Sequence, residues 1–226
     1  MKKIPTLFVR EFKDHEVVNT TSEVTKGFEW VLNGEGVATV KWDGACCAII
    51  DGELYKRYDA KKGKKAPEGA IPCCEPDPIT GHHPHWLKCD RNKPEDKWFW
   101  KAYDYTIEHY GNQPDGTYEA VGKHFNGNPY DFIDGDYMIP HGKAIIPEKD
   151  LFRCYGGIKK YLTEHYIEGI VFWKDGEPQC KIKRKDFGLD WNNKEKDIDR
   201  LDDESYYIYY INEDWDDIKW KIKIDE

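Results

Sequence analysis

The sequence lacks a hydrophobic run long enough to cross a membrane. No stretch of it reaches the roughly 18 consecutive apolar residues of a transmembrane helix. The chain begins Met1-Lys2-Lys3-Ile4-Pro5, without the apolar stretch of a secretory signal. We therefore expect a soluble intracellular protein of the cytoplasm or nucleus, with no membrane partner.

The cysteine pattern of a disulfide framework is also missing. The seven cysteines are odd in number and include the adjacent pairs Cys46-Cys47 and Cys73-Cys74. In a chain without a signal, such cysteines are expected to be reduced. A structural zinc site is one alternative, although the spacing does not match a usual zinc pattern. Its ligands would come from a cluster within 17 positions: Cys73, Cys74, His82, His83, His85 and Cys89.

A surplus of basic charge is absent as well, since the formal net charge is -9. Such a chain is not expected to coat nucleic acid nonspecifically, because that binding depends on neutralisation of phosphates by Lys and Arg. Residues 191–226 carry twelve acidic and six basic residues, so this tail supplies much of the excess. Basic residues cluster over 56–65 and 181–185. Solvated surface is the simplest interpretation of the first cluster and fits the second less well, because its alternation points some lysines inward.

The order of predicted strands and helices indicates a mixed α+β domain, because the two do not alternate regularly and no repeat is visible. Residues 36–50 predict two strands joined by a tight turn at Asp43-Gly44, and residues 61–97 predict a long surface loop. We expect helices over 95–109 and 148–163, and further strands over 53–58, 116–122, 166–173, 178–184, 206–211 and 218–224.

Lys41 opens the tetrapeptide Lys41-Trp42-Asp43-Gly44 at the end of the first predicted strand. A lysine on a buried strand beside an acid and a glycine is where a covalent lysyl-nucleotide would form. The tetrapeptide alone is a weak signal, since an exposed lysine before a turn is the commoner arrangement. Further candidates follow in order along the chain: Arg57, Glu119, Glu168, Lys181 and Lys183.

These residue types suit the transfer of a nucleotide to lysine. A lysine of ordinary pKa needs that pKa lowered by roughly 3 units, or about 4 kcal/mol, to be a nucleophile at neutral pH. Burial and neighbouring cations lower it. Lys181 and Lys183 lie two apart on a predicted strand and share a face, so they can supply those cations to Lys41 and hold phosphates.

The acids and the arginine have matching roles. Glu168 is the best candidate for binding Mg²⁺, which prefers hard oxygen ligands. Its alternative is a solvent-facing acid at the start of a strand. Glu119 suits contact with a ribose or a metal-bound water, and the fork of Arg57 suits ribose or phosphate oxygens.

This ordered set resembles the covalent nucleotidyltransferases, which are ATP-dependent DNA and RNA ligases and messenger RNA capping enzymes. A closer resemblance is to a family of stand-alone ATP-dependent RNA ligases of viruses and bacteria, with a vertebrate RNA ligase as a relative. It covers roughly residues 28–191 and is carried by Glu29-Trp30, Lys41-x-Asp43-Gly44, Cys73 to Trp86, Gly116 to Pro129, His141-Gly142, Glu168-Gly169-Ile170-Val171 and Lys181 to Trp191.

The resemblance implies an adenylyltransferase domain over 1–190, built of antiparallel sheets flanked by helices and without an oligonucleotide-binding barrel. The acidic, aromatic extension over 191–226 is expected to pack on it. The activity implied uses ATP with Mg²⁺ or Mn²⁺: a lysine is adenylylated, AMP passes to an RNA 5′-phosphate, and an RNA 3′-hydroxyl displaces it.

The resemblance also assigns roles to residues. The catalytic set is Lys41, Asp43, Glu168 and Lys183, and Glu168 is the metal ligand. The nucleotide contacts are Lys41, Arg57, Glu119, Glu168, Lys181 and Lys183. Thr80-Gly81-His82 belongs to a family loop, which weakens the zinc alternative. Phe125 and Tyr130 are the candidates for the aromatic residue that stacks on adenine.

Three other functions stay open. A minimal DNA nick ligase fits the same chemistry, because sequence does not reveal which sugar is read. A capping guanylyltransferase is less favoured, because only 36 residues lie from Trp191 to the end and leave little room for its barrel domain. A noncatalytic RNA-binding module is the third, and the ordered lysines and acids argue against it.

Overall fold

The computed structural model describes residues 3–14, 16–78, 80–133 and 135–191. The chain divides into two compact units. Of the described residues, unit 1 takes residue 3 and those within 43–141, and unit 2 takes those within 4–42 and 142–191. The expected extension over 191–226 lies outside the described residues except for Trp191, so its packing stays a prediction.

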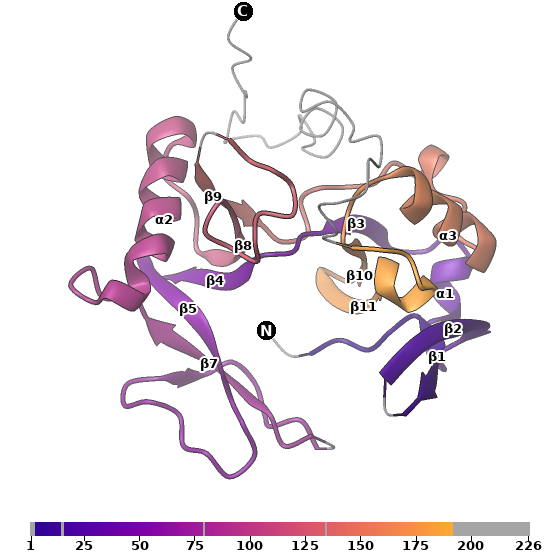
Figure 1. The fold of residues 1–226 in the computed structure, drawn as a ribbon, viewed down its shortest axis with the longest axis horizontal. Helices are drawn as coiled ribbons and strands as arrows, with labels where there is room; N and C mark the ends of the chain where they lie inside the picture. Colours follow the sequence, from indigo (N-terminus) through magenta and orange to yellow (C-terminus); the bar gives the residue numbers. More distant parts are fainter. Residues whose placement is uncertain (1–2, 15, 79, 134, 192–226) are drawn as a thin grey trace, which may run out of the picture. The chain divides into compact units, whose positions relative to one another are not determined.

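Unit 1 is built on one antiparallel sheet of six strands (Figure 1). Helix α2 (Lys97–Tyr110) follows a short 3-10 turn, η1 (Pro94–Asp96), and lies against this sheet. In sheet order the strands are β6 (Ile71–Pro72), β7 (His83–Lys88), β5 (Glu53–Ala60), β4 (Ala45–Ile50), β8 (Gly116–Gly122) and β9 (Asp136–Pro140).

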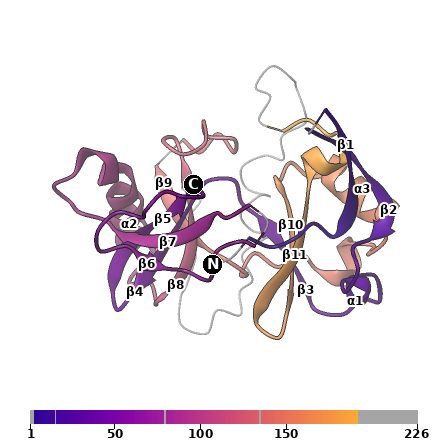
Figure 2. The same ribbon diagram turned by 90° about the horizontal axis from the view of Figure 1, so that it is seen from below.

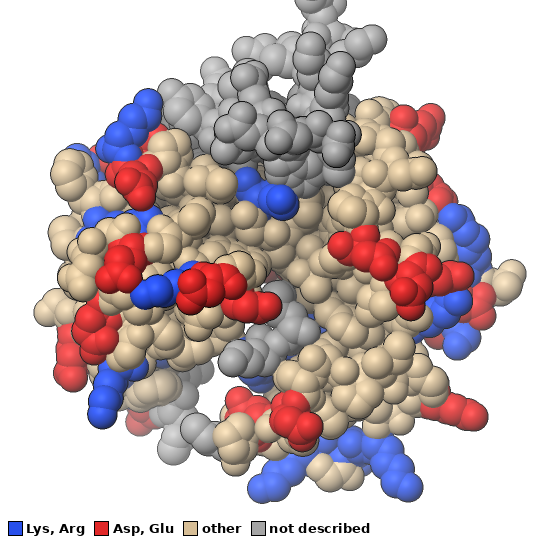
Figure 3. All heavy atoms as spheres, turned by 180° about the vertical axis from the view of Figure 1, so that it is seen from behind, with Lys and Arg blue, Asp and Glu red and all other residues tan. Residues whose placement is uncertain are grey.

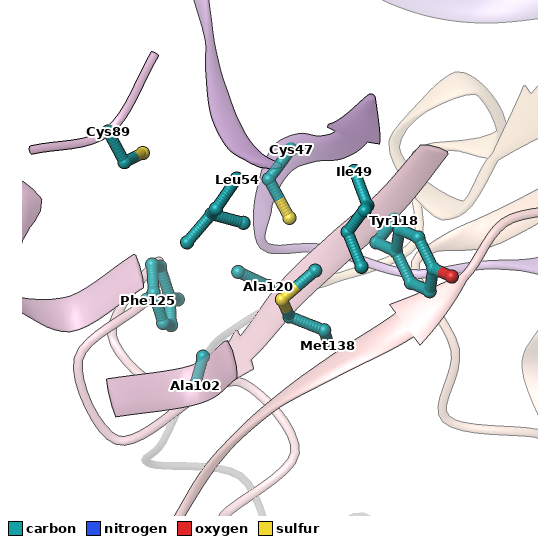
Figure 4. Close-up of a cluster of buried hydrophobic side chains, with 9 residues drawn as sticks. All are labelled: Cys47, Ile49, Leu54, Cys89, Ala102, Tyr118, Ala120, Phe125 and Met138. Atoms are coloured by element: carbon teal, nitrogen blue, oxygen red, sulfur yellow. The ribbon is translucent and has the colours of Figure 1, made fainter. Parts of the chain in front are cut away.

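One face of this sheet holds a hydrophobic core, because successive side chains of a strand point to opposite faces. Cys47 and Ile49 of β4 are 0% and 2% exposed and pack with Tyr118 and Met138 of the neighbouring strands (Figure 4). The aromatic side chains of α2 cover this cluster: Trp98, Phe99, Trp100 and Tyr103. The alternate residues of β4, β5 and β8 therefore lie on the other face.

Unit 2 contains a three-stranded antiparallel sheet and a two-stranded hairpin (Figure 2). The sheet order is β11 (Glu177–Lys183), β10 (Gly169–Lys174) and β3 (Val37–Lys41), and the hairpin joins β1 (Phe8–Lys13) to β2 (Glu16–Val24). Leu7 N donates to Lys181 O at 2.8 Å, so the segment before β1 covers the edge of β11. The helical elements are α1 (Glu29–Leu32), η2 (Glu148–Asp150), α3 (Tyr155–Glu164) and η3 (Arg184–Phe187).

Several predicted elements are confirmed. The helix after Pro94 ends at Gly111, whose φ is 79°, as its glycine stop indicates. Asp175 and Gly176 have φ of 55° and 76° and join β10 to β11 in the predicted hairpin. The predicted strands over 53–58 and 116–122 correspond to β5 and β8.

Other expectations were wrong in part. The strands on either side of Asp43-Gly44 exist but do not pair, because β3 bonds to β10 while β4 bonds to β5 and β8. The expected loop over 61–97 contains β6 and β7, and β7 pairs with β5 along its length. The expected helix over 148–163 is interrupted after η2, and α3 begins at Tyr155. Strands β1, β2 and β9 were not predicted, and the strands expected over 206–211 and 218–224 lie outside the described residues.

The class is mixed α+β, with mostly antiparallel sheets and few helices. Within the described ranges, no sheet closes into a barrel. None of the helices described there has the length and apolar character to span a membrane.

Candidate functional site

Three lysines of unit 2 project from one face of the β3–β10–β11 sheet. Lys41 and Lys183 both pair with Gly169, one from each side, and Lys181 pairs with Val171 two positions along β10. Residues two apart on a strand share a face, so all three ammonium groups leave the same side. The opposite side is apolar and at most 4% exposed: Val40, Ile170 and Ile182.

Glu168 links two of these lysines. Its side chain is 8% exposed, and one carboxylate oxygen contacts Lys41 Nζ. The other oxygen accepts from Lys183 Nζ at 3.0 Å. The carboxylate thus offsets the repulsion between two ammonium groups. We call Lys41, Glu168, Lys181 and Lys183 the lysine cluster; the structure brings all four together.

Gly169 allows the strands of the cluster to approach. A Cβ at this position would collide with the carbonyl oxygen of Ile182 and the Cα of Lys183. Both are backbone atoms of β11 and cannot turn away as a flexible side chain would. Glycine is therefore required after Glu168 for a steric reason, whereas Glu168 itself serves through its carboxylate.

Lys181 has a lowered pKa. The pKa falls from 10.5 to about 8, chiefly because of burial and also because of nearby Lys41, Lys183 and Arg10, while Glu168 acts in the opposite direction. Among the described residues, Lys181 makes no ion pair. The sequence predicted this combination of causes at Lys41, and in the structure they act on Lys181. The expectation for Lys41 itself stays a prediction.

The residues after β11 anchor the cluster. Lys183 N donates to Asp186 Oδ2 at 2.9 Å, and Asp186 also forms a salt bridge with Arg10 at 3.0 Å. Arg184 is 4% exposed and donates to the carbonyl oxygens of Leu162 and of His165, the latter at 3.1 Å. Arg184 therefore fixes the chain and is not part of a basic surface, although the sequence placed it in a basic cluster.

In unit 1, Arg57 and Glu119 lie on the face of the six-stranded sheet that is opposite to the hydrophobic core. Cys46 of β4 pairs directly with Glu119 of β8, and Cys47 pairs with Lys56, which puts Cys46 opposite Arg57. Arg57 Nε donates to Asp59 Oδ1 at 2.8 Å. Burial, and to a smaller extent Glu119, raises the pKa of the Cys46 thiol to about 12, while Arg57 acts in the opposite direction.

Both carboxylate oxygens of Glu119 have partners. Oε1 accepts from Gly44 N at 3.0 Å, and Oε2 lies 3.0 Å from His141 Nε2. The other ring nitrogen of this histidine lies 3.0 Å from Thr117 Oγ1. Glu119 thus connects the Asp43-Gly44 turn to the residue that follows β9.

The loop after β8 holds Asp43. Asn126 Nδ2 donates to Asp43 Oδ1 at 2.8 Å and to Gly44 O at 2.7 Å. Asp43 N donates to the hydroxyl of Tyr130 at 2.7 Å. Sequence reasoning did not find these positioning contacts, although the motif ending Asn126-Gly127-Asn128-Pro129 was the signal that marked the loop.

The two candidates for adenine stacking differ in access. Phe125 is 5% exposed and belongs to the hydrophobic core (Figure 4). Its ring meets that of Phe99 edge-on, at 5.4 Å between ring centroids. It offers no open ring face to a ligand. Tyr130 is half-buried, with its hydroxyl bound to Asp43.

The cysteines and histidines over 73–89 do not form a metal-ligand cluster in the described part of the chain. Cys89 is buried in the hydrophobic core of unit 1, and His85 Nδ1 lies 2.8 Å from the carbonyl oxygen of His83. The ligand atoms that do gather within 4.8 Å of one another belong to Cys46, Glu119 and His141. The sequence missed this group because its members are far apart along the chain.

Acidic and basic side chains are interspersed over the face seen in Figure 3, and neither sign forms a continuous area there. No protein-family model matches the chain, and no curated protein matches it either. The function must therefore be argued from the residues and their geometry.

Proposed function

We propose that this protein is an ATP-dependent RNA ligase with a nucleotidyltransferase fold. It would join 5′-phosphate and 3′-hydroxyl RNA ends through a lysyl-AMP on Lys41 and an RNA-adenylate. The observation that carries the proposal is the lysine cluster. A chain-ordered set of three lysines and one glutamate, predicted from the sequence, meets on one face of a single sheet.

The cluster suits the binding of a triphosphate. Lys181, which makes no ion pair among the described residues, and Lys183 would hold the phosphate oxygens. Glu168 is a hard-oxygen ligand of the kind that Mg²⁺ takes together with waters and phosphates, so it would hold the ion. When bound, the ion supplies positive charge that offsets the charge developing on the phosphoryl oxygens.

The first chemical step is attack by Lys41. Its ammonium loses a proton, for which Glu168, in contact with Nζ, is our candidate acceptor. Nζ then forms a bond to the α-phosphorus of ATP, and the bond from that phosphorus to the pyrophosphate oxygen breaks. An oxygen of the RNA 5′-phosphate next attacks the same phosphorus, and the bond to Nζ breaks. Finally the RNA 3′-hydroxyl attacks the 5′-phosphorus, loses its proton and displaces AMP.

The unit 1 residues have supporting roles in the proposal. Arg57 and Glu119 are assigned to the nucleotide because of the family resemblance and because both lie on the same face of their sheet, opposite to the hydrophobic core. Asp43 is held by Asn126 and Tyr130 and would fix the turn that follows Lys41-Trp42. The roles of Arg57, Glu119 and Asp43 rest mainly on the family resemblance, whereas the role of the lysine cluster also rests on its geometry.

Intact mass after incubation with each nucleoside triphosphate and Mg²⁺ tests the nucleophile. We expect the wild-type protein to gain one AMP from ATP, and Lys41→Ala and Lys41→Arg to gain none. Lys41→Arg keeps the positive charge beside Glu168 but removes the nucleophilic amine. Lys174→Ala is the matched control, since Lys174 ends β10 in the same sheet and pairs with the exposed Glu35.

A gain of GMP in place of AMP would favour a capping guanylyltransferase, and no adduct with any triphosphate would contradict the proposal. A second measurement compares labelled 5′-phosphorylated RNA and DNA ends with the adenylylated protein. Sealing of a DNA nick with no reaction of RNA would overturn the choice of substrate and leave the lysine chemistry intact.

A further inference from the structure

We propose that Cys46, Glu119 and His141 form a binding site for a thiophilic divalent metal ion of the Zn²⁺ type. This inference goes beyond the proposed function and does not depend on it. Its basis is the meeting of a thiol, a carboxylate and an imidazole in unit 1, on the face of the six-stranded sheet opposite to the hydrophobic core.

The strand register brings the three side chains together. Cys46 and Glu119 are direct partners on the antiparallel strands β4 and β8, so their side chains are neighbours on one face. Glu119 pairs with Ile139 of β9, and His141 lies two positions beyond Ile139, which places it on the same face. Two paired strands therefore supply Cys46 and Glu119, and the residue directly after a third strand supplies His141.

The spacing of the ligand atoms fits one small ion. Sγ of Cys46, an oxygen of Glu119 and a ring nitrogen of His141 all lie within 4.8 Å of one another. His141 Nε2 and Glu119 Oε2 are 3.0 Å apart. Two ligands of a tetrahedral zinc ion, each at about 2.1 Å, lie about 3.4 Å apart. The imidazole and the carboxylate would therefore need to separate by only a few tenths of an ångström to hold the ion between them.

The surroundings orient the ligands as in a metal site. Thr117 Oγ1 lies 3.0 Å from His141 Nδ1, and a hydrogen bond there leaves Nε2 to face Glu119. Gly44 N donates to Glu119 Oε1, which holds the carboxylate with its second oxygen toward the imidazole. The side chains of His141 and Glu119 are 15% and 12% exposed, so the group is sheltered but has access to solvent.

The donor set selects the class of ion. Thiolate and imidazole suit Zn²⁺ and Co²⁺, whereas Mg²⁺ prefers an all-oxygen shell. The nearby cation Arg57 would repel a dication, but its charge is offset by Asp59 at 2.8 Å. Three protein ligands leave a fourth position for water or another donor.

The test is metal binding by the full-length protein, with Zn²⁺ and Co²⁺ as the probes. We expect one equivalent of Zn²⁺ per chain to survive dialysis, and Co²⁺ to give a thiolate-to-metal charge-transfer band. Cys46→Ser and His141→Gln should each weaken Zn²⁺ binding at least about a hundredfold. Cys46→Ser should also abolish the band, because it removes the thiolate. Excess Mg²⁺ should not displace the ion.

The matched control is Cys154→Ser, which alters an exposed cysteine of unit 2 and keeps a side chain able to cap α3. Circular dichroism and melting of the metal-free variants check that each one folds, and Glu119→Gln provides a third ligand variant. Binding by Cys46→Ser equal to that of the wild type, or no bound Zn²⁺ in the wild type, would overturn the site. Loss of binding in Cys74→Ser alone would overturn it too, in favour of the 73–89 cluster.

Binding by Lys41→Ala separates the two proposals. This variant should bind Zn²⁺ as the wild type does, because Lys41 is not among the ligands. A wild-type protein that binds Zn²⁺ but gains no AMP would contradict only the ligase proposal. A wild-type protein that gains AMP but binds no Zn²⁺ would contradict only the metal site.

Discussion

At the scale of single residues, the lysine cluster contains three lysines and one acid, and the acid forms ion pairs with two of the three. Glu168 has two carboxylate oxygens, and Lys41 and Lys183 occupy them. Lys181 lies on the same face without an ion pair in the described part of the chain, and burial lowers its pKa to about 8. A partly buried ammonium that makes no ion pair within the described ranges costs free energy, and the anion of the proposed function would offset this cost.

We predict that Lys181→Met makes the protein more stable at pH 7. The folded protein keeps Lys181 protonated below about pH 8 despite its lowered pKa, so the cost is present there. As the pH rises from about 8 toward 10.5, the folded form loses this proton while the unfolded chain keeps it, and the cost disappears. The gain in the free energy of unfolding should be about 1 kcal/mol, because solvent screens a partly exposed group.

Denaturant midpoints at pH 7 and pH 10 measure this effect. The exposed Lys149 supplies the control, and Lys149→Met should leave both midpoints unchanged. A Lys181→Met midpoint that falls at pH 7, or a gain that is as large at pH 10, would show that the ammonium does not carry the cost.

At the scale of elements, strand register decides which side chains meet. Gly169 of β10 sits between Lys41 of β3 and Lys183 of β11 in one row across the sheet. The same rule joins Cys46 of β4 to Glu119 of β8 in unit 1. A shift of one residue in either register would turn these side chains to the apolar face.

Replacement of Gly169 by alanine should therefore destabilise unit 2. Its Cβ would collide with the backbone of β11, and we expect the free energy of unfolding to fall by about 2 kcal/mol. Gly156→Ala is the opposite case, because Gly156 is exposed in α3 with no atom within 4 Å of its Cβ position. Alanine there should stabilise the protein by about 0.5–1 kcal/mol.

Urea unfolding of both glycine variants gives the comparison. The urea midpoint should fall below that of the wild type for Gly169→Ala and rise above it for Gly156→Ala. A Gly169→Ala variant of wild-type stability would mean that β10 and β11 are not as closely spaced as the structure has them.

At the scale of the whole molecule, charge would limit how the RNA of the proposed function is held. The net charge is -9, and the structure shows acidic and basic side chains interspersed on the face seen in Figure 3. The lysine cluster offers a few cations in one place and shares them with Glu168. Binding of an RNA end should therefore depend on a small number of phosphate contacts.

This argument predicts a shallow dependence of RNA affinity on salt. For three to five phosphates on a single strand, the slope of log K against log salt concentration is about -2 to -4. Equilibrium binding of a 5′-phosphorylated RNA across a KCl series measures it. A slope steeper than about -7 would indicate a basic surface larger than the cluster.

Elements marked by signals within a few neighbouring residues were predicted from the sequence. Elements that depend on pairing between distant segments were missed or placed wrongly. The Asp175-Gly176 turn and the Pro94 to Gly111 helix were predicted because their signals lie within a few residues of each other. The strands β6 and β7 were missed because histidines and prolines obscure their alternation. The hairpin expected at Asp43-Gly44 was wrong because the apolar residues on both sides fit any buried sheet, and their partners lie elsewhere in the chain.

The sequence by itself determined the lysine and glutamate types of the cluster, the two-residue spacing of Lys181 and Lys183, and the negative charge of the chain. These properties are local or additive, so no partner is needed to derive them. Only the tertiary structure decided that Glu168 forms salt bridges with Lys41 and Lys183, and that Lys181 has a lowered pKa. It alone brought Cys46, Glu119 and His141 together, because strand pairing between distant segments is set by burial of the whole sheet and not by neighbouring residues.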